Sequence, residues 1–294
     1  MTFPGIDTVA DHRCLLGEGP VWDSKEGSIY WIDILSGDIH RYHLAQKSFT
    51  THKTGQVLGA IARRAQGGLV AAFHNGFALI APDTQAISYI GDPEAHLPGN
   101  RFNDGKVDPL GNFWAGTMSY SETPGAGSLY RLGRDFSITR QTGNVTISNG
   151  MAWSPDHQTF YYIDTTSAEV VSYRFDVHTG GISDKKSIVT IAPEDGHPDG
   201  MTIDDEGMLW IAHWDGWQVT RWDPHTGKKL SHIRLPAARI TSCTFGGETL
   251  EDLYITSAKN GLTAQQLAQQ PLAGALFVIR NCGYKGMPAF EFGG

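Results

Sequence analysis

The sequence has few cysteines, no long hydrophobic run and no excess of positive charge. Its three cysteines stand far apart, at positions 14, 243 and 282, and do not suggest a disulfide framework or a zinc cluster. No apolar run approaches the roughly 18 residues that a membrane-spanning helix needs, so we expect no membrane partner. The net charge of −8 argues against nucleic acid as a partner, because binding to a phosphate backbone needs a basic face.

The N-terminal stretch also lacks the pattern of a secretion signal. MTFPGIDTVADHRC has no basic start followed by an apolar segment, so we expect a cytoplasmic protein whose thiols stay reduced. The 35 glycines and 14 prolines are spread along the chain rather than clustered. That distribution favours many short strands and tight turns over long helices.

A repeat runs through the whole chain. Each of six stretches has a turn residue or a polar pair, then an aliphatic residue or phenylalanine, and usually an aromatic residue next. The stretches are 27–34, 67–74, 111–118, 158–165, 207–214 and 251–258. Their third residues recur every 40 to 49 positions, and such a period with several strands per unit is typical of a β-propeller. The sequence therefore predicts an all-β fold: a six-bladed β-propeller that forms one domain over residues 1–294.

The segments between the repeats support this fold. A strand is predicted to follow most of the repeat stretches, at 37–44, 127–134, 168–175, 217–224 and 274–281. One short helix is expected near 262–270. Propellers are usually closed by a terminal strand that completes the last blade, and residues near 5–12 are the candidates for that strand.

The repeat also shows which residues occupy equivalent positions in the six blades. Counting back about ten residues from each marker leads to Glu18, Leu58, Asn103 or Asp104, Asn149, Asp199 and Ser242. If these positions ring the central channel, Glu18, Asn149 and Asp199 converge there. Two carboxylates in a narrow channel repel unless a cation or a proton relieves them, and oxygen donors alone suit a hard divalent ion. The sequence thus predicts a metal site in the central channel.

A simpler interpretation of these positions also exists. Asx-Gly before a strand is an ordinary turn signal, and we interpret Asp104 as a turn residue, with a bound water or a second ion as the alternative. His197 is interpreted as a surface or turn residue. Trp214 and Trp217, in HWDGW, are candidates for blade packing or for the wall of a sugar pocket.

Five sequence motifs are similar to those of a known protein family. LLGEGPVW (15–22), NRFNDGKVDPLGNFWAGTM (100–118), ISNGMAWSPD (147–156), PDGMTIDDEGMLW (198–210) and CTFGG (243–247) occur in this order and spacing. Together they resemble the SMP-30/gluconolactonase/regucalcin family over nearly the whole chain. The resemblance implies a six-bladed propeller with one catalytic divalent cation in its channel. Oxygen ligands are compatible with Ca²⁺, Mg²⁺, Mn²⁺, Zn²⁺ and Fe²⁺.

The resemblance also implies an activity and roles for single residues. The expected reaction is metal-dependent hydrolysis of a sugar (aldono)lactone, such as gluconolactone, to the aldonic acid. By motif, Glu18, Asn149 and Asp199 look like the metal ligands, and Asp199 also looks like the general base. Arg101 and Asn103 look like substrate-binding residues.

One position departs from the pattern of some family members. They place a substrate-contacting Glu three residues after G-T-M, where this chain has Ser121, and Glu122 comes next. We therefore expect Glu122 to bind the substrate if the loop slips by one residue. Two other functions stay open. One is a non-catalytic calcium-binding or regulatory propeller, and the other is a lactonase or esterase with a different substrate. The sequence does not indicate an oligomeric state.

Overall fold

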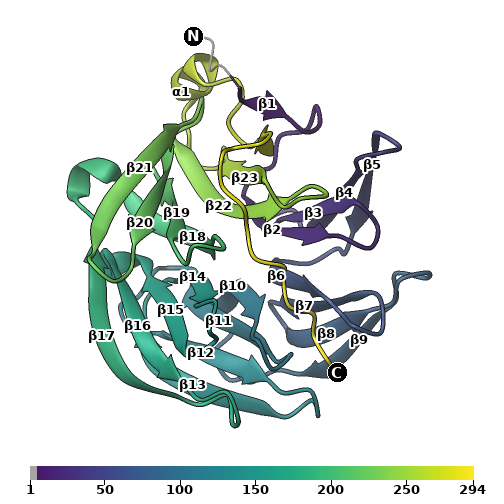
Figure 1. Cartoon of the computed structure of the whole chain (residues 1–294). Coiled ribbons are helices and arrows are strands. Elements are labelled where there is room, and N and C mark those ends of the chain that lie inside the picture. Colours follow the sequence, from purple (N-terminus) through teal and green to yellow (C-terminus); the bar gives the residue numbers. More distant parts are fainter. Residues whose placement is uncertain (1–4) are drawn as a thin grey trace.

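The computed structural model describes residues 5–294 of the chain. It contains six four-stranded antiparallel sheets, which Figure 1 shows arranged as blades around a centre. The prediction of an all-β, six-bladed propeller is confirmed. Among the described residues, no helix is both long enough and apolar enough to cross a membrane.

The first strand of each blade lies closest to the centre, where it contacts the first strands of neighbouring blades. These inner strands are β2 (Gly17–Asp23), β6 (Leu58–Arg63), β10 (Asn100–Val107), β14 (Ser148–Trp153), β18 (His197–Ile203) and β22 (Arg239–Gly246). The second strands coincide with the six repeat stretches of the sequence. They are β3 (Ser28–Asp33), β7 (Leu69–Phe73), β11 (Phe113–Ser119), β15 (Thr159–Asp164), β19 (Leu209–Trp214) and β23 (Asp252–Ala258).

The third and fourth strands continue each blade toward the rim. The third strands are β4 (Asp38–His43), β8 (Gly76–Ile80), β12 (Gly127–Leu132), β16 (Glu169–Phe175), β20 (Gln218–Asp223) and β24 (Phe277–Ile279). The fourth are β5 (Ser48–Lys53), β9 (Ile87–Gly91), β13 (Ile138–Val145), β17 (Ile182–Thr190), β21 (Lys228–Arg234) and β1 (Asp7–Thr8). The outer strands are the most exposed, which explains their polar sequences.

The N-terminal strand β1 closes the ring. It pairs antiparallel with β24, so that the last blade combines both ends of the fold. This confirms the closing strand expected near residues 5–12. The expected helix is α1 (Ala264–Gln269), which starts at a capping box of Thr263 and Gln266. Two 3₁₀ turns, η1 (Thr165–Ser167) and η2 (Pro193–Asp195), complete the elements.

The core lies between the blades, and for this reason the second strands are almost entirely buried. Tryptophans of the repeat fill this space: Trp31, Trp114 and Trp210 are at most 1% exposed. Trp114 donates its indole N–H to Asp108 Oδ2 at 2.8 Å, and Trp210 donates to Asp204 Oδ2 at 2.9 Å. The pairing of a buried indole N–H with an Asp side chain thus occurs in two blades, where it satisfies the donor.

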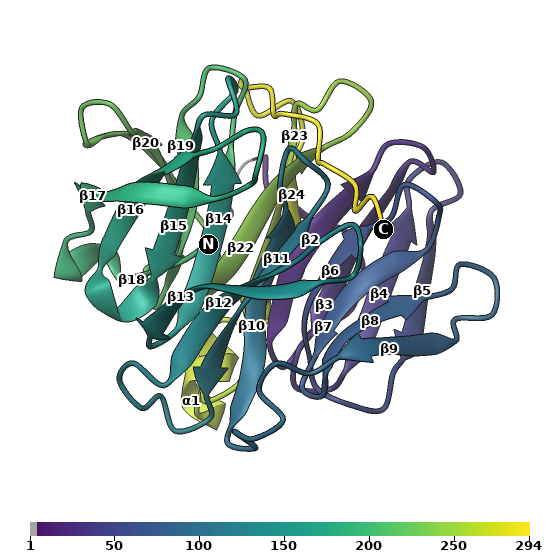
Figure 2. The same ribbon diagram turned by 90° about the horizontal axis from the view of Figure 1, so that it is seen from below.

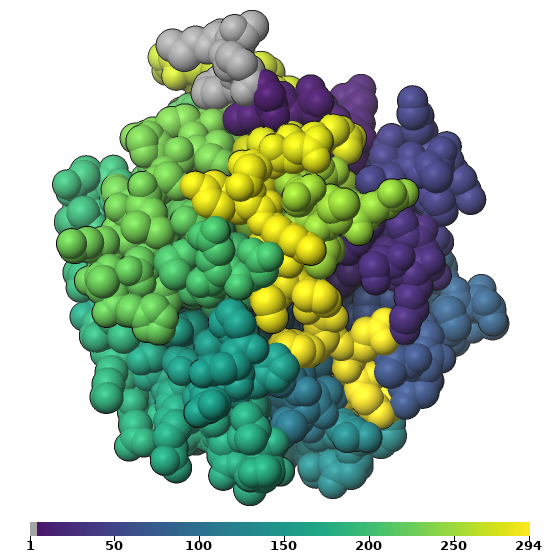
Figure 3. All heavy atoms as spheres, in the orientation of Figure 1, coloured from purple at the N-terminus to yellow at the C-terminus, as the bar shows by residue number. Residues whose placement is uncertain are grey.

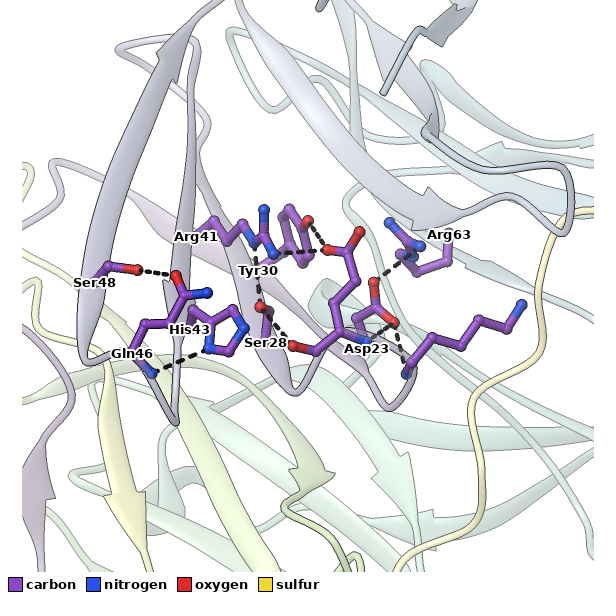
Figure 4. A network of polar contacts seen from close by, with 10 residues as sticks. Asp23, Ser28, Tyr30, Arg41, His43, Gln46, Ser48 and Arg63 are labelled. Carbon is purple, nitrogen blue, oxygen red and sulfur yellow. Dashed lines mark hydrogen bonds and ion pairs between the residues drawn. The ribbon is translucent and has the colours of Figure 1, made fainter. Parts of the chain in front are cut away.

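Polar contacts also join neighbouring blades. Figure 4 shows Arg63 of β6 paired with Asp23 of β2 at 2.9 Å, across the boundary between the first two blades. Within the first blade, Glu26 accepts a hydrogen bond from Tyr30 and pairs with Arg41 at 2.9 Å. The Arg63–Asp23 pair is largely buried, so it fixes the relative position of two inner strands.

The C-terminal segment 286–294 crosses one end of the channel, as the yellow chain in Figure 3 shows. Bridges pair Gly286 with Asp204 and Phe292 with Arg64, and the Phe292 side chain is fully buried. Figure 2 places this segment and α1 at opposite ends of the propeller. The channel is therefore covered at one end, and a site must be approached from the end where the inner strands begin.

Candidate functional site

Every inner strand carries an irregularity near its start. The pairing with the second strand shifts register between residues 18 and 21, 58 and 60, 102 and 104, 149 and 151, 198 and 201, and 240 and 242. Such β-bulges redirect side chains and are frequent beside functional sites. The polar residues at equivalent positions of the repeat thus lie inside strands. Their interpretation as turns that precede the strands is wrong.

A cavity of about 480 Å³ opens at this end of the channel. All six residues that the sequence predicted for the site line it: Glu18, Arg101, Asn103, Glu122, Asn149 and Asp199. They come from the inner strands of four blades and from the loop after β11. The structure therefore brings the whole predicted set together, while the roles assigned to these residues stay predictions.

The acidic residues of the cavity are buried close enough to affect one another. Glu18 and Asp199 are only 4% and 6% exposed. Burial raises the pKa of Glu18 well above its usual value, and the negative charge of Asp199 raises it further. Burial likewise raises the pKa of Asp199, with the charge of Asp104 as the next cause. A cation bound between the two carboxylates would offset the free-energy cost of ionising them in a buried site.

Asn149 offers the observation that tests whether a cation fits. Its Nδ2 donates a hydrogen bond to Thr165 Oγ1 at 2.8 Å, while its Oδ1 is buried and has no hydrogen-bond partner. A buried acceptor without a partner is costly, and a bound cation is one way to satisfy it. With Glu18 and Asp199 it forms an oxygen-only donor set, which suits a hard divalent cation. The residues present therefore fit the predicted metal.

Arg101 is held rigidly at the edge of this set. Its guanidinium donates to Asn103 Oδ1 at 2.7 Å and to the carbonyl of Phe102 at 3.0 Å. Asn103 in turn donates to the carbonyl of Ser148 at 2.8 Å, which links the third blade to the fourth. Burial lowers the pKa of Arg101, while the nearby tyrosine and carboxylates oppose that change. Arg101 and Asn103 thus form one preorganised pair.

The loop after β11 contributes Glu122. Glu122 has a left-handed backbone with φ of 53°, and it lines the cavity. The hydroxyl of Ser121 instead makes contacts with Ser119 at 3.1 Å and Thr123 at 3.0 Å within the loop. Of the two residues at the position where the family pattern departs, Glu122 is the one that borders the cavity.

Asp104 differs from the expectation. It lies in β10 at the bulge, is 7% exposed, and is not a turn residue. Its Oδ1 accepts a hydrogen bond from the backbone N–H of Gly105 at 2.7 Å, and its charge acts on Glu18 and Asp199. Asp104 lines a second cavity of about 100 Å³ on the covered side, together with Lys106. It therefore borders the closed part of the channel while its charge acts on the acidic residues of the open site.

Several lining residues were not singled out in the sequence. Leu16, Ile34, Met118 and Ile147 form apolar parts of the wall, and Thr165, Thr166, Asp215 and Asn260 add polar groups. Most of them stand at or just after the end of a second strand, which returns to the face where an inner strand begins. That periodic position is the signal that could have found them. His197, which was interpreted as a surface or turn residue, lines the cavity. Of the two tryptophans left between blade packing and a pocket wall, Trp214 lines the cavity and Trp217 does not.

A comparison with protein families places the chain. The profile of the SMP-30/Gluconolactonase/LRE-like region matches residues 16–259. The chain belongs to this family. Its relatives include the regucalcin of Danio rerio, which is 40% identical over 291 residues that cover 98% of each protein. The family resemblance stated from the motifs is thereby confirmed.

Solved structures of family members have the same fold. A calcium-binding protein, the regucalcin of Agrobacterium tumefaciens, superposes with a TM-score of 0.93 at 29% identity, with 99% of this chain and 97% of that one covered. A luciferin-regenerating enzyme gives a TM-score of 0.92 at 32% identity, with 97% and 98% covered. SMP-30/gluconolactonase-type proteins with different names thus share this propeller, so the fold alone does not fix the substrate.

Proposed function

We propose that the protein is a metal-dependent lactonase that hydrolyses a sugar (aldono)lactone, such as gluconolactone, to the aldonic acid. Family membership supports lactonase chemistry in general. The specific proposal rests on the donor set of Glu18, Asn149 and Asp199, with the partnerless Asn149 Oδ1 as the observation that carries it. Hydroxyl-rich substrates suit the Arg101–Asn103 pair that stands beside this set.

The reaction adds water to a ring ester and opens the ring. Glu18, Asn149 and Asp199 would hold the divalent cation through their side-chain oxygens. When bound, the cation supplies Lewis-acid polarisation of the lactone carbonyl. The remaining steps are proton transfers and positioning, which the protein side chains perform.

Asp199 is the proposed general base. It takes a proton from the water that attacks the carbonyl carbon, and it returns a proton to the ring oxygen when the carbon–oxygen bond breaks. An ordinary Asp is too acidic for this work at neutral pH. Burial and the neighbouring Asp104 raise the pKa of Asp199 in the metal-free protein, whereas a bound cation lowers it, so the role of base rests on the position of Asp199 in the cavity beside the proposed metal ligands.

Arg101, Asn103 and Glu122 are the proposed substrate contacts. The guanidinium of Arg101 uses one nitrogen on Asn103 and Phe102, so that its other N–H groups remain for sugar hydroxyls or developing negative charge. Asn103 holds the guanidinium in place. Glu122 accepts hydrogen bonds from hydroxyls at the exposed edge of the cavity.

The test is acid release from a panel of aldonolactones: glucono, galactono, xylono and arabinono. Each is offered to protein treated with a chelator and then to protein with Ca²⁺, Mg²⁺, Mn²⁺ or Zn²⁺ restored. The proposal predicts that turnover disappears with the chelator and returns with a metal, and that Glu18→Gln stays inactive in every condition. No turnover with any pairing of lactone and metal contradicts the proposal.

A calcium-binding propeller without turnover is the second candidate. The Agrobacterium tumefaciens relative, called a calcium-binding protein, and the oxygen donors of the cavity favour this alternative. The same panel, extended by an aryl ester and by a calorimetric titration with Ca²⁺, separates these functions. Tight Ca²⁺ binding at Glu18 and Asp199 without turnover of any lactone supports the binding protein, whereas turnover of aryl esters alone supports an esterase with another substrate.

A further inference from the structure

A cysteine and two histidines meet at the point where the propeller closes. One ligand atom each from His12, Cys14 and His40 lies within 4.8 Å of the other two. Cys14 and His40 are buried, with exposures of 1% and 0%, and His12 is half-buried. The spacing of these residues in the sequence did not predict the cluster, because His12 and Cys14 lie in a connecting segment and His40 lies in β4.

The two nitrogens of His40 differ in their surroundings. Nδ1 contacts Thr51 Oγ1 at 2.9 Å, whereas Nε2 is buried and has no hydrogen-bond partner. A buried ring nitrogen without a partner is costly in a fully enclosed side chain. This second observation, independent of the clustering, indicates that the structure leaves a donor atom for a ligand.

Burial acts differently on the two imidazoles and on the thiol, and only the imidazoles are already in the form that binds a metal. Burial lowers the pKa of His40 to about 4, and it also lowers the pKa of His12, so both imidazoles are neutral near pH 7. Neutral imidazole is the form that binds metals. Burial raises the pKa of the Cys14 thiol to about 12, so that without a metal the thiol keeps its proton.

We propose that His12, Cys14 and His40 form a second metal site, for Zn²⁺ or a similar borderline cation, which fastens the closure of the propeller. Two nitrogens and one sulfur suit Zn²⁺ and do not suit Ca²⁺ or Mg²⁺. On binding, the metal–sulfur bond forms, and the Cys14 thiol releases its proton to solvent. The half-buried His12 leaves the fourth position open to water.

The distances allow this with small movements. Zinc binds sulfur at about 2.3 Å and nitrogen at about 2.0 Å, which separates ligand atoms by roughly 3.5 Å in a tetrahedron. Atoms up to 4.8 Å apart must therefore approach by about 1 Å. No side-chain hydrogen bond holds His12 among the described contacts, so its ring is the part that moves.

The location gives the site its role. His12 and Cys14 lie in the segment that connects β1, at the rim of the last blade, with β2 of the first blade. Cys14 donates its backbone N–H to the carbonyl of Gly274 in the last blade at 2.8 Å. His40 belongs to β4 of the first blade. A metal on these three residues therefore joins the two blades that close the ring.

The alternative is that the cluster is only aromatic packing. The ring centroids of His12 and His40 lie 4.3 Å apart, and Phe49 and Trp31 pack against His40. Packing alone accounts for the rings but requires neither a cysteine beside them nor a free Nε2. The experiment must therefore detect a metal–sulfur bond and not only added stability.

The test is titration of metal-free protein with Co²⁺, followed by near-ultraviolet absorption. Only a thiolate ligand gives a sulfur-to-cobalt charge-transfer band, so the oxygen site of the channel does not contribute. We expect one equivalent of Co²⁺ with this band in the wild type and in Glu18→Gln, and loss of the band when Zn²⁺ is added. The band should persist in Cys282→Ser, which is the control for the one cysteine that is not fully buried.

Two variants decide the outcome. Cys14→Ser should lose the band, and His12→Gln should bind Co²⁺ at least tenfold more weakly while its metal-free melting temperature stays that of the wild type. His12→Gln keeps the test meaningful if Cys14→Ser does not fold. Absence of the band in the wild type, or a band of full strength in both variants, shows that the cluster is aromatic packing and overturns the proposal.

Discussion

Thr165 links the two strands that carry the predicted metal ligands Asn149 and Asp199. Its Oγ1 accepts a hydrogen bond from Asn149 Nδ2 at 2.8 Å and donates one to the carbonyl of Pro198, the residue before Asp199, also at 2.8 Å. The first bond orients the amide so that Oδ1 stays free of partners. The hydroxyl thus fixes both the direction of one ligand and the backbone of another.

The first prediction concerns this hydroxyl. Thr165→Val keeps the shape of the side chain but removes both hydrogen bonds, so the Asn149 amide loses its orientation. Mutation of a residue that orients a metal ligand typically lowers the metal affinity by about 10- to 100-fold, and we expect a loss in this range for Thr165→Val. Calorimetric titration with Mn²⁺ or Ca²⁺ measures it. Thr165→Ser retains the hydroxyl and should bind like the wild type; equal affinity of all three proteins contradicts the assignment.

The second prediction concerns the ligands themselves. Asp199→Ala and Glu18→Gln should each abolish metal-dependent lactone hydrolysis, because each removes a charged donor from the set, and Asp199→Ala also removes the base. Turnover is measured by acid release at saturating metal, and circular dichroism verifies the fold. Asp215→Asn, at the rim of the same cavity and paired with Arg239, serves as the control and should keep most activity. Turnover near that of the wild type in either ligand variant disproves the site.

Much of the fold could be predicted because a propeller repeats its pattern. The buried second strands carry the same apolar and aromatic order in every blade, and their spacing located the inner strands as well. The closing strand was expected from topology, yet within residues 5–294 its strand pairing with β24 is limited to Asp7 and Thr8. Such a short strand has no periodic signal of its own, so its limits could not be read from the sequence.

The convergence of the predicted site residues in one cavity was predictable for a related reason, and the misread positions have physical causes. Equivalent positions converge on one axis, which is why Glu18, Asn149 and Asp199 were found. Asp104 was misread because Asn-Asp-Gly suits a turn and a β-bulge equally, and only the pairing with β11 separates the two. The cluster of His12 with His40 depends on the closure of the ring, which brings together residues without a common motif.

The third prediction follows from the raised pKa of Asp199. A carboxyl group whose folded-state pKa lies above its unfolded value stabilises the fold at low pH, and this contribution is lost as the pH rises through the folded pKa. In metal-free protein, Asp199→Asn removes that loss. Its melting temperature should therefore exceed that of the wild type at pH 8 by roughly 2 °C or more, and the difference should shrink toward pH 4.

The control for this prediction is the metal. Adding Ca²⁺ or Mn²⁺ at pH 8 should stabilise the wild type but not Asp199→Asn, so the order of the two melting temperatures reverses. Thermal unfolding followed by circular dichroism across the pH range measures both effects. If the variant is less stable than the metal-free wild type at pH 8, the carboxylates of the cavity do not repel one another as inferred.

The fourth prediction separates Glu122 from Ser121. Because Glu122 lines the cavity and Ser121 contacts its own loop, Glu122→Gln should raise KM for the preferred lactone several-fold with a smaller change in kcat. Gln keeps a hydrogen-bond acceptor, so the loss should be smaller than the roughly 1.5–3 kcal/mol of a whole charged hydrogen bond. Ser121→Ala should leave both parameters near those of the wild type. Steady-state kinetics with both variants checks this, and the opposite ranking shows that the loop presents Ser121 to the substrate.

The last prediction concerns the segment that covers the far end of the channel. Phe292 is fully buried among Val107, Phe113 and other residues of the second and third blades, and its backbone N–H donates to Arg63 at 2.8 Å. Phe292→Ala should lower the free energy of unfolding by about 3–5 kcal/mol, because a large cavity replaces the ring. Phe290→Ala, which removes a partly exposed ring from the same segment, should cost clearly less. Urea unfolding measures both values. The segment lies opposite the open cavity, so the kcat of Phe292→Ala, measured under conditions where the variant is folded, should equal that of the wild type. A specific loss of kcat in the folded variant would mean that the covered end also shapes the site through Asp104.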